Sequence, residues 1–374
     1  MTNLKEESWY QISNADELDS PALVFYPERI AENIARLKNS INDISRLRPH
    51  VKTHKNPEIT RMMIDAGISK FKCATIAEAE MLAICSAADV LLAYQPVGPK
   101  ISRLIRLAKT YPDTHFSCLC DNVASLKAIA AAAVAAGLEL DLYLDLNVGM
   151  NRTGIAPDEN AVLLYQQIEA EPGVNARGLH AYDGHIHDGS LETRKQKCQL
   201  VLSAISWIND QIVASGLPKP VIVAGGTPTY PLYAALEDIE CSPGTFILWD
   251  KGYQDAFAEQ NYLTAALVIT RVISLNGPAA LTVDLGHKSV AAENDLHRRV
   301  YFLNAPHATM KGQSEEHLVL DAGAGHGFQI GDVLYGLPIH ICPTVALYGT
   351  AAHVENHRVN GEWKITAREK RINI

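Results

Sequence analysis

The strongest constraint on the fold is an alternation of strand-like and helix-like segments from about residue 20 to residue 250. Apolar runs alternate with segments of helical period, and they lie at residues 70–74, 90–94, 114–120, 138–147, 176–182 and 221–224. A first strand at residues 20–26 and a last strand region at 240–248 bring the pattern to about eight βα repeats. Such repeats form a parallel sheet covered by helices, so we predict an α/β fold with a (β/α)8 TIM-type barrel.

The periodicity changes near residue 252. Short strand-like runs follow without long helices between them, at residues 265–273, 280–285, 317–320, 333–338 and 363–367. We therefore predict a barrel over residues 22–252 and a mostly β domain built from residues 1–21 and 253–374. The chain has 374 residues, which is long enough for a barrel of about 250 residues and a smaller domain.

Composition excludes several functional classes. The net charge of −9 without a long Lys/Arg run is unfavourable for nucleic-acid binding. No apolar run reaches the length of a membrane span, and the polar N-terminal segment is not a signal peptide. Seven cysteines without a CxxC spacing favour a reducing compartment. We expect a cytoplasmic protein that binds neither nucleic acid nor membranes.

The segment RPHVKTHK, residues 48–55, places Lys52 among His50, His54 and Arg48. Nearby positive charge and burial both disfavour a protonated lysine, so its amine becomes a usable nucleophile near neutral pH. A lysine that forms a Schiff base needs this property. Taken alone, such a cluster could also be a basic surface loop.

Two further segments follow predicted barrel strands, and the active site of a (β/α)8 barrel gathers at the carboxyl ends of its strands. In GMNRTG, residues 149–154, the glycines allow a sharp turn that presents Arg152 either to a cofactor or to solvent. The segment HAYDGHIHD, residues 180–188, contains three histidines. His185 and His187 alternate like strand residues, so the segment could supply a general base, a stacking ring or metal ligands, or be a solvent-facing loop.

Two later segments suggest ligand binding. The glycines and threonines of residues 225–229, GGTPT, end a strand and open a helix, which predicts an anion site. His340 and Cys342 lie two positions apart in a strand-like segment and would share a face. An imidazole and a thiolate suit a divalent ion such as zinc, and water or substrate would have to complete its coordination. The alternative is a buried cysteine beside a hydrogen-bonded histidine. Two turn-like segments, residues 284–288 and 321–326, could line the same cleft.

Together these motifs resemble the fold-type III pyridoxal 5′-phosphate (PLP) enzymes, the alanine racemase-like group. The closest resemblance is to the branch with D-threonine aldolase and D-serine dehydratase. It is carried by RPHVKTHK, CATIAEAE, GMNRTGI, HAYDGH, AGGTPT with SPGTF, DLGHK and PIHICPTV, which span residues 48–345. It implies that Lys52 binds PLP as a Schiff base. The other residues that it implies for cofactor binding are His50, Arg152, Tyr182, Gly225, Gly226, Thr227 and Tyr253.

The resemblance also implies a divalent metal, zinc or manganese, on His340 and Cys342, and a homodimer. The implied activity is a lyase reaction on D-β-hydroxy amino acids. We expect retro-aldol cleavage to glycine and an aldehyde, with His185 or His187 as the base. The alternative is a D-serine dehydratase that gives a keto acid and ammonia, with Lys52 as the base. The metal pair argues against a racemase, and the C-terminal β domain argues against a non-catalytic PLP-binding protein.

Overall fold

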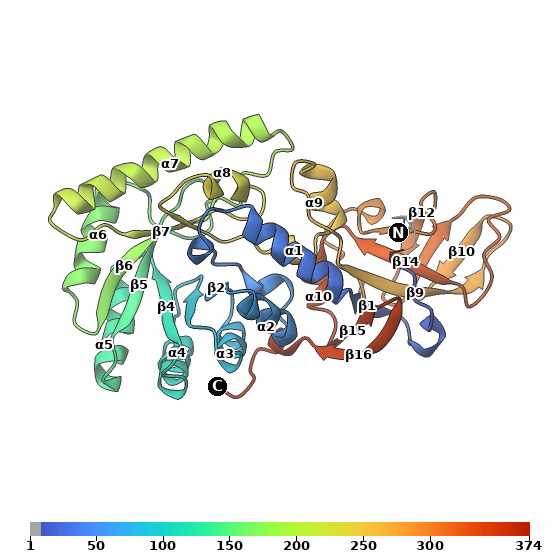
Figure 1. The fold of residues 1–374 in the computed structure, drawn as a ribbon, viewed down its shortest axis with the longest axis horizontal. Coiled ribbons are helices and arrows are strands. Elements are labelled where there is room, and N and C mark those ends of the chain that lie inside the picture. The colour runs from blue at the N-terminus through green and yellow to red at the C-terminus, as the bar shows by residue number, and fades with distance from the viewer. Residues whose placement is uncertain (1–8) are drawn as a thin grey trace. The chain divides into compact units, whose positions relative to one another are not determined.

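The computed structural model describes residues 9–374, in two compact units (Figure 1). The barrel unit holds a parallel sheet and consists of Leu37–Lys52, Ile59–Gly244 and Glu369–Ile374. The β unit consists of the described residues up to Arg36, Thr53–Glu58 and Thr245–Arg368. In the described part of the chain, no helix is long and apolar enough to cross a membrane.

The barrel unit is organised around seven parallel strands that neighbour one another in chain order. They are β2 (Lys70–Cys73), β3 (Asp89–Leu92), β4 (His115–Cys120), β5 (Leu140–Asp145), β6 (Val174–Ala181), β7 (Val221–Ala224) and β8 (Ile239–Cys241). The connecting helices are α2 (Pro57–Asp65), α3 (Ile76–Ile84), α4 (Pro99–Thr110), α5 (Val123–Ala136), α6 (Glu159–Ala170), α7 (Leu191–Ala214) and α8 (Tyr230–Ala234). The predicted parallel α/β architecture is confirmed.

A short irregular segment, residues 47–50, lies between the two edge strands of this sheet. Leu47 forms a parallel bridge to Cys241 of β8, and His50 forms one to Lys72 of β2. The Lys72 N–H donates to the Pro49 carbonyl at 3.0 Å. Pro49 has no N–H, so this segment cannot form a regular ladder. The segment nevertheless takes the eighth position and connects β8 to β2.

The strand predicted at residues 20–26 is real, but its place is not in the barrel. β1 (Ala22–Phe25) pairs antiparallel with β9 and parallel with β15 in the β unit. A four-residue apolar strand is equally suited to either sheet, so the sequence did not distinguish them. In chain order the first barrel segment is residues 47–50, the same segment that joins β8 to β2.

The inward face of the barrel carries an apolar layer. Leu91, Leu119, Tyr143 and Val223 form a buried cluster there, one from each of four strands. Alternate residues of a barrel strand point inward, so the next inward positions toward the carboxyl ends supply the site described below.

The β unit is a nine-stranded sheet, which confirms the predicted mostly β domain. Its main path is β12-β13-β10-β9-β1-β15-β16, while β14 pairs with β9 and β11. The strands besides β1 are β9 (Ala266–Leu275), β10 (Ala280–Val283), β11 (Val300–Phe302), β12 (Thr309–Gln313), β13 (Leu318–Asp321), β14 (Val333–Pro338), β15 (Thr350–Glu355) and β16 (Arg358–Lys364). The short helices α9 (Lys251–Ala256) and α10 (Ile341–Val345) also belong to it. The helix α1 (Pro27–Asn39) begins in the β unit and ends in the barrel unit.

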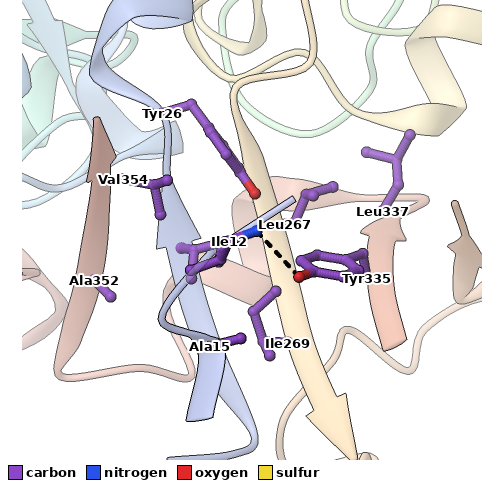
Figure 2. Close-up of a cluster of buried hydrophobic side chains, with 10 residues drawn as sticks. Ile12, Ala15, Tyr26, Leu267, Ile269, Tyr335, Leu337, Ala352 and Val354 are labelled. Atoms are coloured by element: carbon purple, nitrogen blue, oxygen red, sulfur yellow. Dashed lines mark hydrogen bonds between the residues drawn. The ribbon is translucent and has the colours of Figure 1, made fainter. Parts of the chain in front are cut away.

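One face of this sheet is closed by the N-terminal segment. Ile12 and Ala15 pack against β1, β9, β14 and β15, and the Ile12 N–H donates to the Tyr335 hydroxyl at 3.2 Å (Figure 2). Residues 9–21 thus lie in the β unit, and the boundary at residues 21 and 22 stays a prediction. Residues 1–8 lie outside the described part of the chain.

Candidate active site

A cavity of about 230 Å³ opens at the carboxyl ends of the barrel strands. Its lining includes four of the residues predicted from the sequence, His50, Lys52, Arg152 and Tyr182. The other lining residues are Lys72, Ala74, Ala93, Tyr94, Thr153 and His180. This is the end of the barrel at which a site was expected.

Lys52 is held by the turn that follows residues 47–50. It lies in the 3-10 turn Val51–Thr53, and its N–H donates to Nδ1 of His50 at 3.2 Å. The expected surroundings of Lys52 are only partly correct. Arg48 points away to the carboxylates of the half-buried Asp89 and the buried Glu240. His54 belongs to the β unit, where burial lowers its pKa to about 3.

The ring of Tyr182 lies among three basic side chains of the cavity. The Nζ atoms of Lys72 and Lys52 are 5.3 and 5.7 Å from its centroid, and the Arg152 Cζ is 5.3 Å away. A Cβ on Gly226 would lie 3.2 Å from the Tyr182 Cε2 atom, so glycine lets the ring approach the loop after β7. The sequence had singled out Tyr182 and Arg152, but not Lys72.

The predicted turn around Arg152 is confirmed. Gly149 and Gly154 have φ angles of 121° and 96°, a region that favours glycine. A Cβ on Gly154 would lie 2.6 Å from the backbone nitrogen of Asn147, so no side chain fits there. The turn brings Arg152 to the cavity although the residue is exposed.

The histidines of residues 180–188 are separated by the structure. His187 is exposed, and His185 packs against Gly149, where an added Cβ would lie 2.6 Å from its Nε2. Neither lines the cavity. The histidine that does is His180, which is 3 % exposed and comes from β6.

His180 is oriented by a carboxylate. Its Nδ1 lies 2.6 Å from Oδ1 of Asp145, while its Nε2 is buried without a hydrogen-bond partner among residues 9–374. Burial and the charge of Lys72 lower the pKa of His180. Burial alone would raise the pKa of Asp145, but the hydrogen bonds to His180 and Thr153 and the charges of His180 and Lys72 together lower it. A neutral His180 that donates from Nδ1 to Asp145 therefore keeps a lone pair on Nε2 that no described residue uses.

The loop after β7 is tied down by hydroxyl groups. The Gly226 N–H donates to Oγ1 of Thr229 at 3.2 Å, and that hydroxyl donates to Asp183 at 3.0 Å. Thr227 Oγ1 accepts from the Gly244 N–H at 3.0 Å. The helix that follows, α8, has only five residues, and the anion site at residues 225–229 stays a prediction.

One orphaned atom lies next to this loop. Ser242 follows β8, and its Oγ is buried without a hydrogen-bond partner among the described residues. Cys241 pairs with Ala224, so Ser242 and Gly225 extend neighbouring strands from paired positions. An oxygen-rich ligand group near this loop would give the Ser242 hydroxyl its missing partner.

The proposed metal pair lies in the β unit. The Nδ1 of His340 is 2.6 Å from Oε1 of Glu293, and the Cys342 thiol contacts the Thr53 hydroxyl at 3.3 Å. Burial would lower the pKa of His340, but Cys342 and Glu293 raise it to about 9. Residues 9–374 contain no cluster of three His, Cys, Asp or Glu side chains that could hold a metal ion.

His340 and Cys342 were placed on a strand, but β14 ends at Pro338, and Cys342 lies in α10, which His340 precedes. The segment has a helical period, so the argument from strand alternation was wrong. Tyr253 lies on α9 with its ring packed against Trp249 and Phe257. Its contact with a cofactor phosphate stays a prediction.

These features define a class of protein: a parallel-barrel enzyme whose cavity combines lysine, arginine, tyrosine and a glycine-rich loop. The chain belongs to the family described as "Alanine racemase, N-terminal domain", which it matches over residues 27–250. Residues 265–354 match a second family, "Putative serine dehydratase domain". The predicted family and fold class are thereby confirmed.

The curated relatives are lyases. A D-threonine aldolase of Arthrobacter sp. is 28% identical over 94% of this chain and 93% of the relative. A 3-hydroxy-D-aspartate aldolase of Paracoccus denitrificans (strain Pd 1222) is 26% identical over 95% and 93%. A D-threo-3-hydroxyaspartate dehydratase of Delftia sp. (strain HT23) is 25% identical over 88% and 93%. They bear out the prediction of a lyase of this group.

Solved structures show the same fold. The crystal structure of D-threonine aldolase from Filomicrobium marinum has a TM-score of 0.87 at 24% identity, covering 96% of this chain and 97% of the other. A D-threo-3-hydroxyaspartate dehydratase, solved as a cysteine-to-alanine mutant in the metal-free form, has a TM-score of 0.82 at 23% identity. It covers 93% and 97% of the two chains.

Proposed function

We propose that the protein is a PLP-dependent lyase that cleaves D-β-hydroxy amino acids by a retro-aldol reaction to glycine and an aldehyde. The observation that supports this most is the likeness to the Arthrobacter D-threonine aldolase along nearly the whole chain. The cavity is consistent with it, because a lysine, an arginine and a tyrosine converge at the carboxyl ends of a parallel barrel.

The residues of the barrel unit fit PLP. Lys52 would attach the cofactor, while His50, Arg152 and Tyr182 line the same cavity. Gly225, Gly226 and Thr227, with the orphaned hydroxyl of Ser242, would hold its phosphate. When bound, PLP supplies an electron sink for breaking bonds at the α-carbon of the substrate. Tyr253 remains a proposed phosphate ligand.

The aldol route needs a base for the proton on the β-hydroxyl oxygen. His185 and His187 are the bases proposed from the sequence, and His180 is a cavity-lining histidine whose Nε2 has no hydrogen-bond partner among residues 9–374. A neutral imidazole with a free lone pair can accept that proton, and the hydrogen bond to Asp145 would stabilise the resulting cation. Single His→Gln variants at the three positions would identify the base by the largest loss of kcat.

We propose that His340 and Cys342 hold a divalent ion, zinc or manganese. Two side chains leave coordination positions for the substrate, and an open site of this kind supplies a Lewis acid for the β-hydroxyl group. The histidine and cysteine positions altered in two structures of the D-threo-3-hydroxyaspartate dehydratase are also two residues apart. The cysteine variant of that protein was obtained in the metal-free form.

That shared spacing favours a second candidate function, dehydration. In this route Lys52 would take the α-carbon proton and the β-hydroxyl would leave, giving a keto acid and ammonia. The same cavity residues would serve both routes. The aldol route removes the β-hydroxyl proton and breaks the Cα–Cβ bond, whereas dehydration removes the α-carbon proton and breaks the Cβ–O bond. We further propose a homodimer in the cytoplasm.

A product assay distinguishes the candidates. The purified protein would receive PLP and Mn²⁺ or Zn²⁺, and then D-threonine, D-serine or 3-hydroxy-D-aspartate in separate reactions. Glycine with an aldehyde supports the aldolase, and a keto acid with ammonia supports the dehydratase. A Lys52→Ala variant that retained the wild-type rate would refute the PLP mechanism.

A further inference from the structure

Lys72 is a buried amine for which the proposed function has no role. It lies on β2 and is only 2 % exposed, yet its side chain lines the cavity. Among residues 9–374, its amine makes no hydrogen bond or ion pair. Burial of an unpaired ammonium group is costly, so a lysine in this position is expected to respond to whatever charge the cavity holds.

Lys72 shares this space with the amine that would attach the cofactor. Both Nζ atoms lie near one ring, at 5.3 and 5.7 Å from the Tyr182 centroid, which limits their separation to about 11 Å. At this separation the cation of Lys52 disfavours the protonation of Lys72.

The other charged neighbours oppose one another. The charges of Lys52 and Arg48 disfavour a cation at Lys72, whereas Asp145 and Asp183 favour it. Burial is the largest influence, and the pKa of Lys72 falls to about 7. The remaining titratable groups of the cavity are His50 in the segment of residues 47–50, Tyr94 after β3, Arg152 after β5, and His180 and Tyr182 at the end of β6.

We propose that Lys72 is a positioning residue whose charge sets the protonation of the nitrogen by which Lys52 holds the cofactor. When Lys72 carries a proton, it disfavours the protonated form of that nitrogen. When Lys72 is neutral, the protonated form is favoured. This inference rests on the proposed function, because it presumes that the cofactor attaches to Lys52.

The test compares the holoenzyme with Lys72→Met and Lys72→Arg variants. The visible absorbance of a lysine-bound PLP follows the protonation of the linking nitrogen, so a pH titration gives a midpoint for each protein. Methionine removes the charge and should raise the midpoint by roughly half a unit or more, whereas the permanent charge of arginine should lower it. A purely structural role would not move the two midpoints in opposite directions.

Lys100 provides the matched control. It is exposed, and its Nζ lies 4.8 Å from the ring of Tyr94, a residue that lines the same cavity. Solvent screens its charge, so Lys100→Met should leave the midpoint unchanged. If Lys72→Arg does not fold, Lys72→Gln serves as a second neutral variant and must reproduce the upward shift.

Borohydride reduction followed by peptide mapping checks the attachment site. The label should appear on Lys52 in the wild type and in each Lys72 variant. A label on Lys72 in the wild type would overturn the proposal, as would midpoints that stay unmoved or that shift together. Wild-type protein that shows no visible band with added PLP would instead refute the proposed cofactor, and with it the proposed function.

Discussion

Replacing Arg48 by methionine should destabilise the barrel unit, because this arginine holds the segment that completes the barrel. Its side chain is 1 % exposed. Nη1 and Nη2 donate to the carboxylate of Asp89 at 2.5 and 3.2 Å, and Nε donates to Glu240 at 2.7 Å. The guanidinium thus ties residues 47–50 to β3 and β8 at once, and its paired donors to Asp89 fix the geometry of that contact.

The size of the effect follows from what the substitution leaves behind. Removing one partner of a buried ion pair costs about 3–5 kcal/mol, because the remaining charge is buried without compensation. Here two carboxylates would remain, and Lys70 still pairs with Glu240. We therefore expect a loss near the lower end, about 3 kcal/mol. The Arg48→Lys variant should have a stability between those of the wild type and Arg48→Met, since one ammonium cannot reach both carboxylates in the same geometry.

Urea unfolding followed by far-UV circular dichroism would measure this loss from the shift of the midpoint at constant slope. Arg177→Met is the control, because the Arg177 side chain is 54 % exposed and its Nε lies 3.7 Å from Asp141. Such a surface pair contributes about 0–1 kcal/mol. If Arg48→Met unfolded at the same midpoint as Arg177→Met, the ionic closure of the barrel would not be a source of stability.

Three further outcomes are expected. Cofactor-free Lys72→Met should be more stable than the wild type by up to about 4 kcal/mol at pH 7, measured by urea unfolding. Burial lowers the pKa of Lys72 in the folded protein from 10.5 to about 7, so the stability of the wild type rises between pH 7 and pH 10.5. The difference in free energy of unfolding between the variant and the wild type should therefore vanish toward pH 10.5. A difference that does not change with pH would contradict this. Gly154→Ala should weaken PLP binding in a fluorescence titration, because its Cβ meets backbone, whereas Gly216→Ala has open space and should bind PLP as the wild type does. Thiol labelling of the native protein with mass-spectrometric mapping should modify Cys342, since the other six cysteines are buried, and added Zn²⁺ should protect it; fast labelling of any other cysteine would contradict the burial argument.

The sequence predicted the architecture because the helical and strand periods alternate clearly between residues 70 and 224. The turn around Arg152 was also predictable, since glycine is the residue that readily adopts the two positive φ angles found there. The position of β1 could not be predicted, because pairing partners are set by long-range contacts that a four-residue strand does not encode. The role of residues 47–50 as the eighth member of the barrel was also hidden, because Pro49 interrupts the strand pattern.

Strand register explains why His180 lines the cavity, whereas His185 and His187 do not. His185 and His187 attracted attention because they alternate, but the strand ends at Ala181, before either residue. His180 lies inside β6, directly paired with Asp145 of β5, and so acquires its carboxylate partner from the register alone. A shift of one residue between these strands would have turned either side chain to the opposite face.

The same reasoning applies to Lys72 and could have been made from the sequence. In a barrel strand, residues two apart point to one face, so Lys70 and Lys72 must both point either inward or toward the helices. The intervening Phe71 is the residue suited to pack against helices, which leaves the lysines inward. One lysine then needs an acidic partner near the bottom of the barrel, and Glu240 supplies it. The other lies closer to the carboxyl end, where the interior opens into the cavity, and there a ligand is the partner that its amine lacks.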